Sequence, residues 1–304
     1  MAERLIDVGG VAIWTESFGQ PDGEPVLLIM GASVQSIYWP DEFIHELVRA
    51  GCFVIRFDNR DTGQSTSFDF SKASYTLDDM ANDALGVLDA YSIRAAHIAG
   101  LSMGGMITQV LMMRHPDRVQ TASLLMTSPL SGGAGDDTQS ATQEHDVTLL
   151  AAQDLPGPNA DWVAQAVAWQ ATEAHTREEK IAKRIARLRM MLGPDEVFDE
   201  TAKTELATRE YDRALDYDAQ DNHPLAIAGS RPSDRREQLS QVHIPTLVVH
   251  GTDDPILPYP HGVALADTIP GANLYTLEGV GHDLAPRYLE PIAQQMIALQ
   301  ARIS

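Results

Sequence analysis

Short apolar runs alternate with amphipathic stretches over the first 131 residues. Runs of apolar residues bounded by turn residues predict buried strands at 25–30, 52–57, 95–99 and 119–127. Stretches with apolar residues at helical spacing predict helices at 40–50, 76–91 and 106–113. Two further runs, 3–7 and 11–15, flank Gly9-Gly10 and predict an opening antiparallel hairpin. Strands that alternate with helices through short links are typical of a mostly parallel central sheet flanked by helices.

This alternation stops near residue 132. Helical patterns without a clear strand signal follow, at 161–172, 177–192 and 201–217. The alternation then returns, with strands expected at 244–251 and 273–277 and helices expected at 262–268 and 289–303. We therefore predict an α/β core domain built from residues 1–131 and 241–304, with a helical cap (lid) subdomain, residues 132–240, inserted between its halves. Most Trp and Met residues of such a cap pack in its core, and some become pocket wall.

Composition excludes several classes of function. The chain has 304 residues, of which 44% are hydrophobic, and 22 basic against 43 acidic residues give a net charge of −21. This charge disfavours nucleic acid and anionic membranes as partners. The N-terminus has no signal-peptide layout and no run approaches the roughly 20 apolar residues of a membrane helix, so we expect a cytoplasmic protein. For its oligomeric state we expect a monomer or a homodimer. The single cysteine, Cys52, excludes an internal disulfide, and no metal-binding spacing or cofactor motif is present.

The sequence Gly100-Leu-Ser-Met-Gly104 joins a predicted strand to a predicted helix. G-x-S-x-G in this context presents its serine on a sharp turn, where glycines leave room for the strained backbone. Ser102 is therefore the candidate nucleophile. A serine hydroxyl is a weak nucleophile at neutral pH, so it needs a base, an acid that orients the base, and donors for the oxyanion.

Histidine is the expected base, because its pKa lies near neutrality. Of ten histidines, only His282 lies in a glycine-flanked loop just after the last predicted strand. The acid is expected at the end of a strand, where both Asp253 and Asp254 qualify. Either choice gives the chain order Ser, Asp, His. The charged turn 58–65 also follows a strand, and we interpret it as an Asp/Arg network that braces a loop.

Four features together resemble the α/β-hydrolase superfamily: the G-L-S-M-G-G motif, the turn at 58–65, the stretch 250–258 and the Gly-Val-Gly-His-Asp loop. In that superfamily the late motif reads H-G-x-x-D-x-x-x-P, and the resemblance implies that Asp254 is the triad acid, since Pro258 lies four residues beyond it. It also implies an oxyanion hole made by the backbone amides of Ala32 and Met103. The fold implied is the α/β-hydrolase fold.

The chain more closely resembles the aclacinomycin methylesterase group of polyketide-tailoring esterases. The matching stretches are 30–31, 39–43, 60–63, 100–104, 254–256 and 260–262. The loop 32–38 departs from that pattern near the expected pocket mouth, and the cap matches are looser than those of the core.

We therefore predict a serine esterase, either a carboxylesterase or a methylesterase, that acts on a moderately hydrophobic small-molecule ester. The same triad also serves lactonases, thioesterases, carbon–carbon hydrolases and cofactor-free perhydrolases (haloperoxidases), and the core sequence does not separate these activities. A non-catalytic receptor on this fold would instead bind its ligand tightly without turnover.

Overall fold

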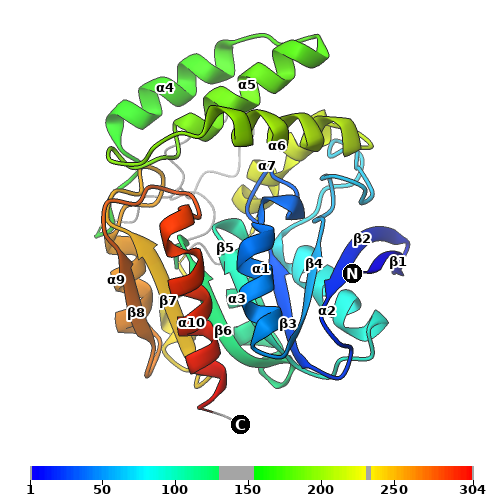
Figure 1. The fold of residues 1–304 in the computed structure, drawn as a ribbon, viewed down its shortest axis with the longest axis vertical. Helices are drawn as coiled ribbons and strands as arrows, with labels where there is room; N and C mark the ends of the chain where they lie inside the picture. The colour runs from blue at the N-terminus through cyan, green and yellow to red at the C-terminus, as the bar shows by residue number, and fades with distance from the viewer. Residues whose placement is uncertain (1, 130–153, 231–233, 303–304) are drawn as a thin grey trace.

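In the computed structural model, which describes residues 2–129, 154–230 and 234–302, eight strands form one sheet (Figure 1). Their order across the sheet is β1-β2-β4-β3-β5-β6-β7-β8. The two pairs β1–β2 and β2–β4 are antiparallel, and all the other neighbours are parallel. The strands are β1 Ala2–Val8, β2 Val11–Phe18, β3 Glu24–Ile29, β4 Cys52–Phe57, β5 Ala96–Leu101, β6 Val119–Leu125, β7 Thr246–Gly251 and β8 Asn273–Leu277.

Helices cover both faces of the sheet. The helices α1 (Asp41–Arg49) and α10 (Leu289–Gln300) lie together on one face, toward the viewer in Figure 1. The other face carries α2 Leu77–Ala90, α3 Met103–Arg114, α8 Arg236–Leu239 and α9 Pro260–Thr268. A parallel strand covered on both faces is apolar along its whole length, which explains why these strands are continuous apolar runs in the sequence.

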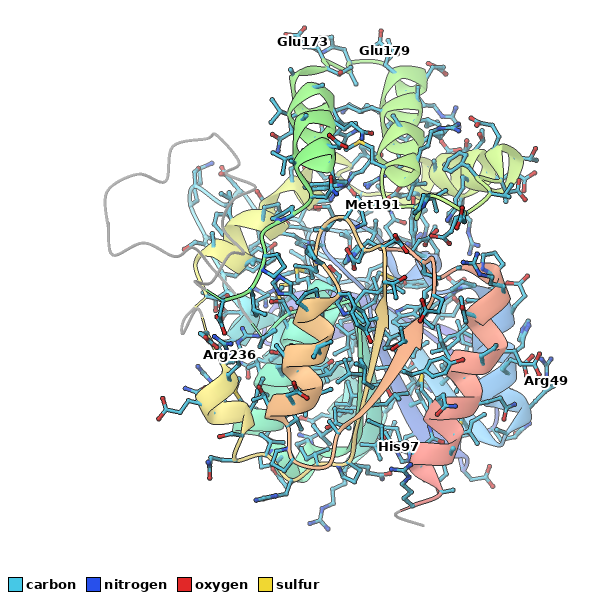
Figure 2. All side chains as sticks on the ribbon, turned by 90° about the vertical axis from the view of Figure 1, so that its left-hand side faces the viewer. Arg49, His97, Glu173, Glu179, Met191 and Arg236 are labelled. Atoms are coloured by element: carbon cyan, nitrogen blue, oxygen red, sulfur yellow. The ribbon has the colours of Figure 1, made fainter. Side chains whose placement is uncertain are left out.

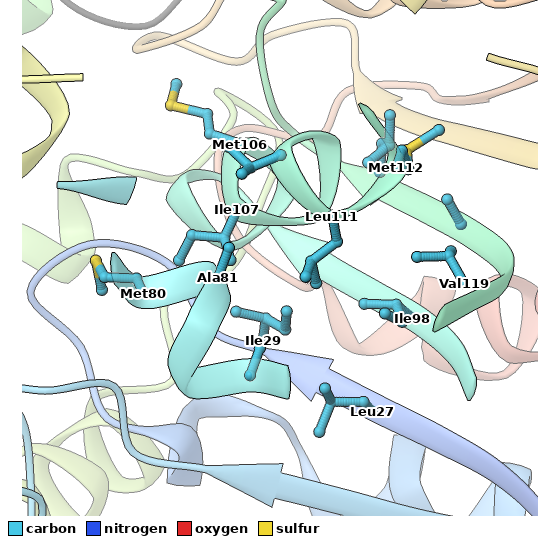
Figure 3. Close-up of a cluster of buried hydrophobic side chains, with 14 of the residues drawn as sticks. Leu27, Ile29, Met80, Ala81, Ile98, Met106, Ile107, Leu111, Met112 and Val119 are labelled. Carbon is cyan, nitrogen blue, oxygen red and sulfur yellow. The ribbon is translucent and has the colours of Figure 1, made fainter. Parts of the chain in front are cut away.

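The packing around β5 fixes the position of the strand that leads to Ser102. Every residue of β5 is buried. Figure 3 shows Ile98 of β5 and Ile29 of β3 next to Leu111 and Ile107 of α3, in the larger of the two apolar clusters. Since side chains interdigitate on both faces, the end of β5 has little freedom to move.

Four helices between β6 and β7 lie over the carboxyl ends of the strands (Figure 1): α4 Ala160–Ala171, α5 Arg177–Arg189, α6 Glu200–Arg213 and α7 His223–Ala228. The predicted cap begins at residue 132, in a stretch (130–153) outside the described residues, so the domain division stays a prediction. The structure corrects the predicted end of the third cap helix. It ends at Arg213 rather than near residue 217, because the backbone turns extended at Ala214 (φ −70°, ψ 134°).

Other predictions of local structure can be compared directly. The helix predicted at 76–91 is α2, and the Asp79 carboxylate caps its first turn by accepting the Thr76 amide at 2.8 Å. Cys52, in the predicted strand 52–57, is buried, and burial raises the pKa of its thiol to about 11. The helix predicted from residue 106 begins three residues earlier, at Met103. Within the described residues, no helix is both long and apolar enough to cross a membrane.

Candidate active site

Ser102 lies on a sharp turn between β5 and α3, with φ 55° and ψ −118°. The left-handed φ is costly for a residue with a side chain, so the surrounding packing must hold it. A Cβ on Gly100 would lie 2.1 Å from the carbonyl oxygen of Gly104, and a Cβ on Gly104 would lie 2.1 Å from that of Ile29. The two glycines of the motif therefore let the turn close and let α3 approach β3, as the sequence predicted.

Two backbone amides beside Ser102 lack acceptors. Met103 is the first residue of α3, and its N–H, like that of Ala32, has no hydrogen-bond partner among the described residues. Both residues line the same cavity as Ser102. The loop that holds Ala32 passes close to the serine, because a Cβ on Gly31 would lie 3.2 Å from Ser102 Cβ. The structure thus brings together the two amides that the resemblance implied, and both can donate to an oxyanion.

The loop at Ala32 is held from both sides. The side-chain amide of Asn59 donates to the Met30 carbonyl at 3.1 Å. On the other side, the Ser33 amide donates to His223 Nδ1 at 2.9 Å, and the Ser33 hydroxyl donates to the carbonyl of Gln220 at 2.8 Å. These contacts fix the direction of the Ala32 N–H.

Asp254 follows β7 and is buried, whereas Asp253 is exposed. Asp254 Oδ1 accepts the amides of Ile256 and Leu257 at 2.9 and 2.8 Å, and Oδ2 accepts His282 Nδ1 at 2.6 Å. Burial alone would raise the pKa of Asp254, but the charge and hydrogen bonds of His282 and His250 outweigh it and hold the pKa well below its ordinary value. Of the two candidate acids, the one in contact with the imidazole is Asp254.

His282 is placed by the segment that follows α5 as well as by its own loop. The His282 amide donates to the Met191 carbonyl at 2.6 Å, and Figure 2 shows Met191 where the upper helices meet the rest of the protein. Glu196 accepts the amides of Gly193 and Gly281 at 2.8 and 2.9 Å, so one carboxylate ties the two loops together. With Nδ1 bound to Asp254, His282 directs Nε2 away from that carboxylate, the arrangement that a general base needs.

Ser102 and His282 share a cavity of about 200 Å³. The Ser102 hydroxyl has no hydrogen-bond partner among the described residues, and such contacts are often long before substrate binds. The cavity wall is mostly apolar, with Trp162 and Met191 from the α4–α7 region and Met30 and Met106 from the rest. Trp162 and Met191 are of the residue types that the sequence predicted as pocket wall in this region, whereas Met30 and Met106 come from the predicted core strand and helix. No group of three or more His, Cys, Asp or Glu in the described ranges is arranged to hold a metal ion.

The charged turn 58–65 braces the loops without entering the cavity. Arg60 binds both carboxylate oxygens of Asp83 at 2.7 Å, and Asp58 accepts the Ser36 amide and pairs with Arg213 at 2.8 Å. The Asp/Arg network predicted for this turn is confirmed, although its partners lie on other elements.

Other residues at the site were not predicted from the sequence: Glu196, His250 and the arginines of α5. His250 Nε2 donates to the Leu257 carbonyl at 2.7 Å and lies 3.5 Å from Asp254 Oδ2. His250 is the first residue of the H-G-x-x-D motif, and this motif is the sequence signal that could have identified His250 as part of the site. Glu196 carries no local signal, because its role depends on a loop 85 residues away.

Comparisons with known proteins identify the family to which the chain belongs. A profile described as the alpha/beta hydrolase fold matches residues 24–285. The chain is 34% identical over 302 residues to rhodomycin D methylesterase DauP of Streptomyces sp. (strain C5), and 34% identical over 300 residues to rhodomycin D methylesterase DnrP of Streptomyces peucetius; each match covers 98% of both chains. The crystal structure of the enol-lactonase from Burkholderia xenovorans LB400 superposes with a TM-score of 0.74 at 21% identity, over 98% of this chain and 100% of that one. These matches confirm the predicted fold class and the predicted resemblance to methylesterases. The chain belongs to the alpha/beta hydrolase fold family.

Proposed function

We propose that this protein is a serine hydrolase that cleaves carboxylic esters, with Ser102 as nucleophile, His282 as base and Asp254 as the acid that orients it. The observation that carries the proposal is one cavity that holds Ser102 on a strained turn, the His282 imidazole hydrogen-bonded to Asp254, and two backbone amides without acceptors. This is the set of groups that acyl transfer requires.

In the proposed reaction His282 Nε2 takes the proton of Ser102 as its oxygen attacks the ester carbonyl. The amides of Ala32 and Met103 stabilise the oxyanion, and the loss of one such donor costs about 2.7–4 kcal/mol of activation free energy. Asp254 stabilises the imidazolium, which then protonates the leaving alcohol. Water hydrolyses the acyl-enzyme by the same steps.

Two relatives named rhodomycin D methylesterases support a methyl ester as the substrate class. The mostly apolar cavity wall agrees with a moderately hydrophobic acyl group. The substrate is thus a small molecule, and neither nucleic acid nor membrane is a proposed partner. The cytoplasmic location and the monomeric or dimeric state stay predictions.

The test is hydrolysis of p-nitrophenyl acetate, butyrate and octanoate by the wild type and by Ser102→Ala. We expect the variant to lose at least about a thousandfold in kcat, because the nucleophile is removed. Ser92→Ala is the matched control, since Ser92 is exposed and also has a left-handed backbone (φ 58°). Near-native turnover by Ser102→Ala would refute the mechanism. Tight ligand binding without turnover by the wild type would favour a receptor.

A further inference from the structure

Two arginines of α5 line the cavity that holds Ser102. Arg184 and Arg187 are three residues apart, so they lie on the same face of the helix. Their position contrasts with the chain as a whole, which carries a net charge of −21. Burial of a cation in an apolar wall is costly unless an anion compensates it. The charges around the two arginines therefore show what this part of the cavity can bind.

Arg184 is nearly fully buried, and its partners leave one nitrogen unused. Its Nε pairs with Glu210 at 2.8 Å, and its Nη2 donates to the Ser33 carbonyl at 2.8 Å and to Gln220 at 2.6 Å. The side chain is 3% exposed, yet Nη1 has no hydrogen-bond partner among the described residues. A buried N–H without an acceptor costs free energy, but Nη1 is itself enclosed, so a ligand oxygen in the cavity does not reach it. Arg184 instead holds the loop at Ser33 and places its charge beside Arg187.

Arg187 has no carboxylate of its own. Its guanidinium lies over the Trp169 ring, 5.2 Å from the centroid, and no described carboxylate oxygen is within 4.0 Å of its nitrogens. Burial and the neighbouring Arg184 lower the pKa of Arg187 to about 10, so it remains charged at neutral pH. Asp221 and Glu210 offset that charge only from a longer distance.

The other ionisable groups at the cavity do not neutralise this charge. Asp283 lines the cavity but pairs with Lys203 at 2.5 Å. Glu210 is shared between Arg184 and the hydroxyl of Tyr38, which donates to it at 2.7 Å. Among the described residues, the Arg187 guanidinium therefore remains on this wall without an ion pair.

We infer that Arg187 forms a carboxylate-binding subsite, so that the preferred ester carries a carboxylate at the end of its acyl chain. The inference rests on the proposed function, because it assigns the acyl chain to the cavity of Ser102. A guanidinium presents two parallel N–H groups, which match the two oxygens of a carboxylate. The apolar wall between this subsite and Ser102 accommodates the carbon chain that separates the two groups.

The experiment compares two substrates of the same shape: the p-nitrophenyl ester of adipic acid, whose other end is a carboxylate, and the p-nitrophenyl ester of adipamic acid, whose other end is a neutral amide. We expect the wild type to prefer the carboxylate by about tenfold or more in kcat/KM, mainly through KM, because a charge-assisted contact is lost with the amide. In Arg187→Met, which keeps the length of the side chain, this preference should disappear. Arg187→Lys should retain part of it.

Arg189→Met is the matched control, because Arg189 is on the same helix, pairs with Glu200 and does not line the cavity. It should keep the wild-type preference. An equal kcat/KM for both substrates in the wild type, or a preference that survives in Arg187→Met, would overturn the inference and leave Arg187 as a packing partner of Trp169.

A binding measurement separates this inference from the esterase proposal. Calorimetry with hexanoate reports on the subsite even if no p-nitrophenyl ester is turned over. Hexanoate should bind the wild type and Arg189→Met at least about tenfold more tightly than Arg187→Met. Equal binding to all three proteins would refute the subsite, whereas absent turnover with intact, Arg187-dependent binding would refute only the esterase proposal.

Discussion

Replacement of Asp254 by asparagine changes one atom of the proposed triad and leaves its shape intact. In the native protein Oδ1 accepts two backbone amides and Oδ2 accepts His282 Nδ1 at 2.6 Å. An asparagine must keep its carbonyl oxygen toward the two amides, since the opposite orientation would place its NH₂ against two N–H donors. The NH₂ then faces His282 Nδ1.

That contact reverses the tautomer of the imidazole. Nδ1 becomes an acceptor, so the ring proton moves to Nε2, which can no longer take a proton from Ser102. The imidazolium also loses a carboxylate 2.6 Å away. The same change in a serine protease lowers kcat about ten-thousandfold, which corresponds to about 5 kcal/mol of activation free energy. We expect a loss of this size in Asp254→Asn, with little change in KM.

The assay is the steady-state hydrolysis of p-nitrophenyl butyrate, with thermal melting to show that the variant is folded. Asp253→Asn is the matched control, because Asp253 is the adjacent carboxylate and is exposed. Within the part of the chain that the structure describes, its side chain accepts the Thr252 hydroxyl at 2.8 Å and nothing else. This variant should keep kcat within about twofold. A folded Asp254→Asn with more than about a tenth of the wild-type kcat would refute the role of Asp254.

Two further predictions concern stability. Gly104→Ala places a methyl group 2.1 Å from the Ile29 carbonyl oxygen, so we expect this variant to lower the free energy of unfolding by about 3 kcal/mol or more. Gly229→Ala is the control and should melt like the wild type, because the nearest neighbour of the added Cβ lies at 3.4 Å. Equal melting temperatures for the two variants would contradict this prediction. Burial lowers the pKa of His97 and of His223 from 6.5 to about 4. Between these pH values the unfolded chain therefore binds more protons than the folded protein. The free energy of unfolding should fall by about 3 kcal/mol per histidine as the pH drops from 7 to 4. Urea unfolding at several pH values measures this loss, and a stability that stays constant down to pH 4 would refute it.

The strands were predictable because a parallel strand covered on both faces must be apolar throughout. Helix ends were less predictable, because local signals compete there. The start of α3 at Met103 was missed, since Met103, Gly104 and Gly105 carry no helix-start signal, and tight packing against β3 sets the helix there. The end of α6 was missed for a similar reason: the apolar and aromatic residues after Arg213 continue the pattern while the backbone turns away.

The residues of the candidate site were likewise predictable only where a local sequence pattern marks them. Ser102 and His282 were predictable, since glycines beside a reactive residue leave a mark in the sequence. The order of the residues could not separate Asp253 from Asp254, because both follow β7. The resemblance to the superfamily motif selected Asp254, and its burial and its contact with His282 agree with that choice. Glu196 was not predictable, because its contact joins loops far apart in the chain.

The α4–α7 region takes part in the proposed chemistry as well as in substrate selection. The loop beside Ala32 is held by His223 and by Arg184, which donates to the Ser33 carbonyl, while His282 is held through the Met191 carbonyl. Arg184 therefore both lines the cavity and fixes the loop that carries an oxyanion donor. Small displacements of such groups cost a large part of the rate, because catalysis depends on their orientation. A substitution that reshapes this region for a new acyl group should thus change kcat together with KM.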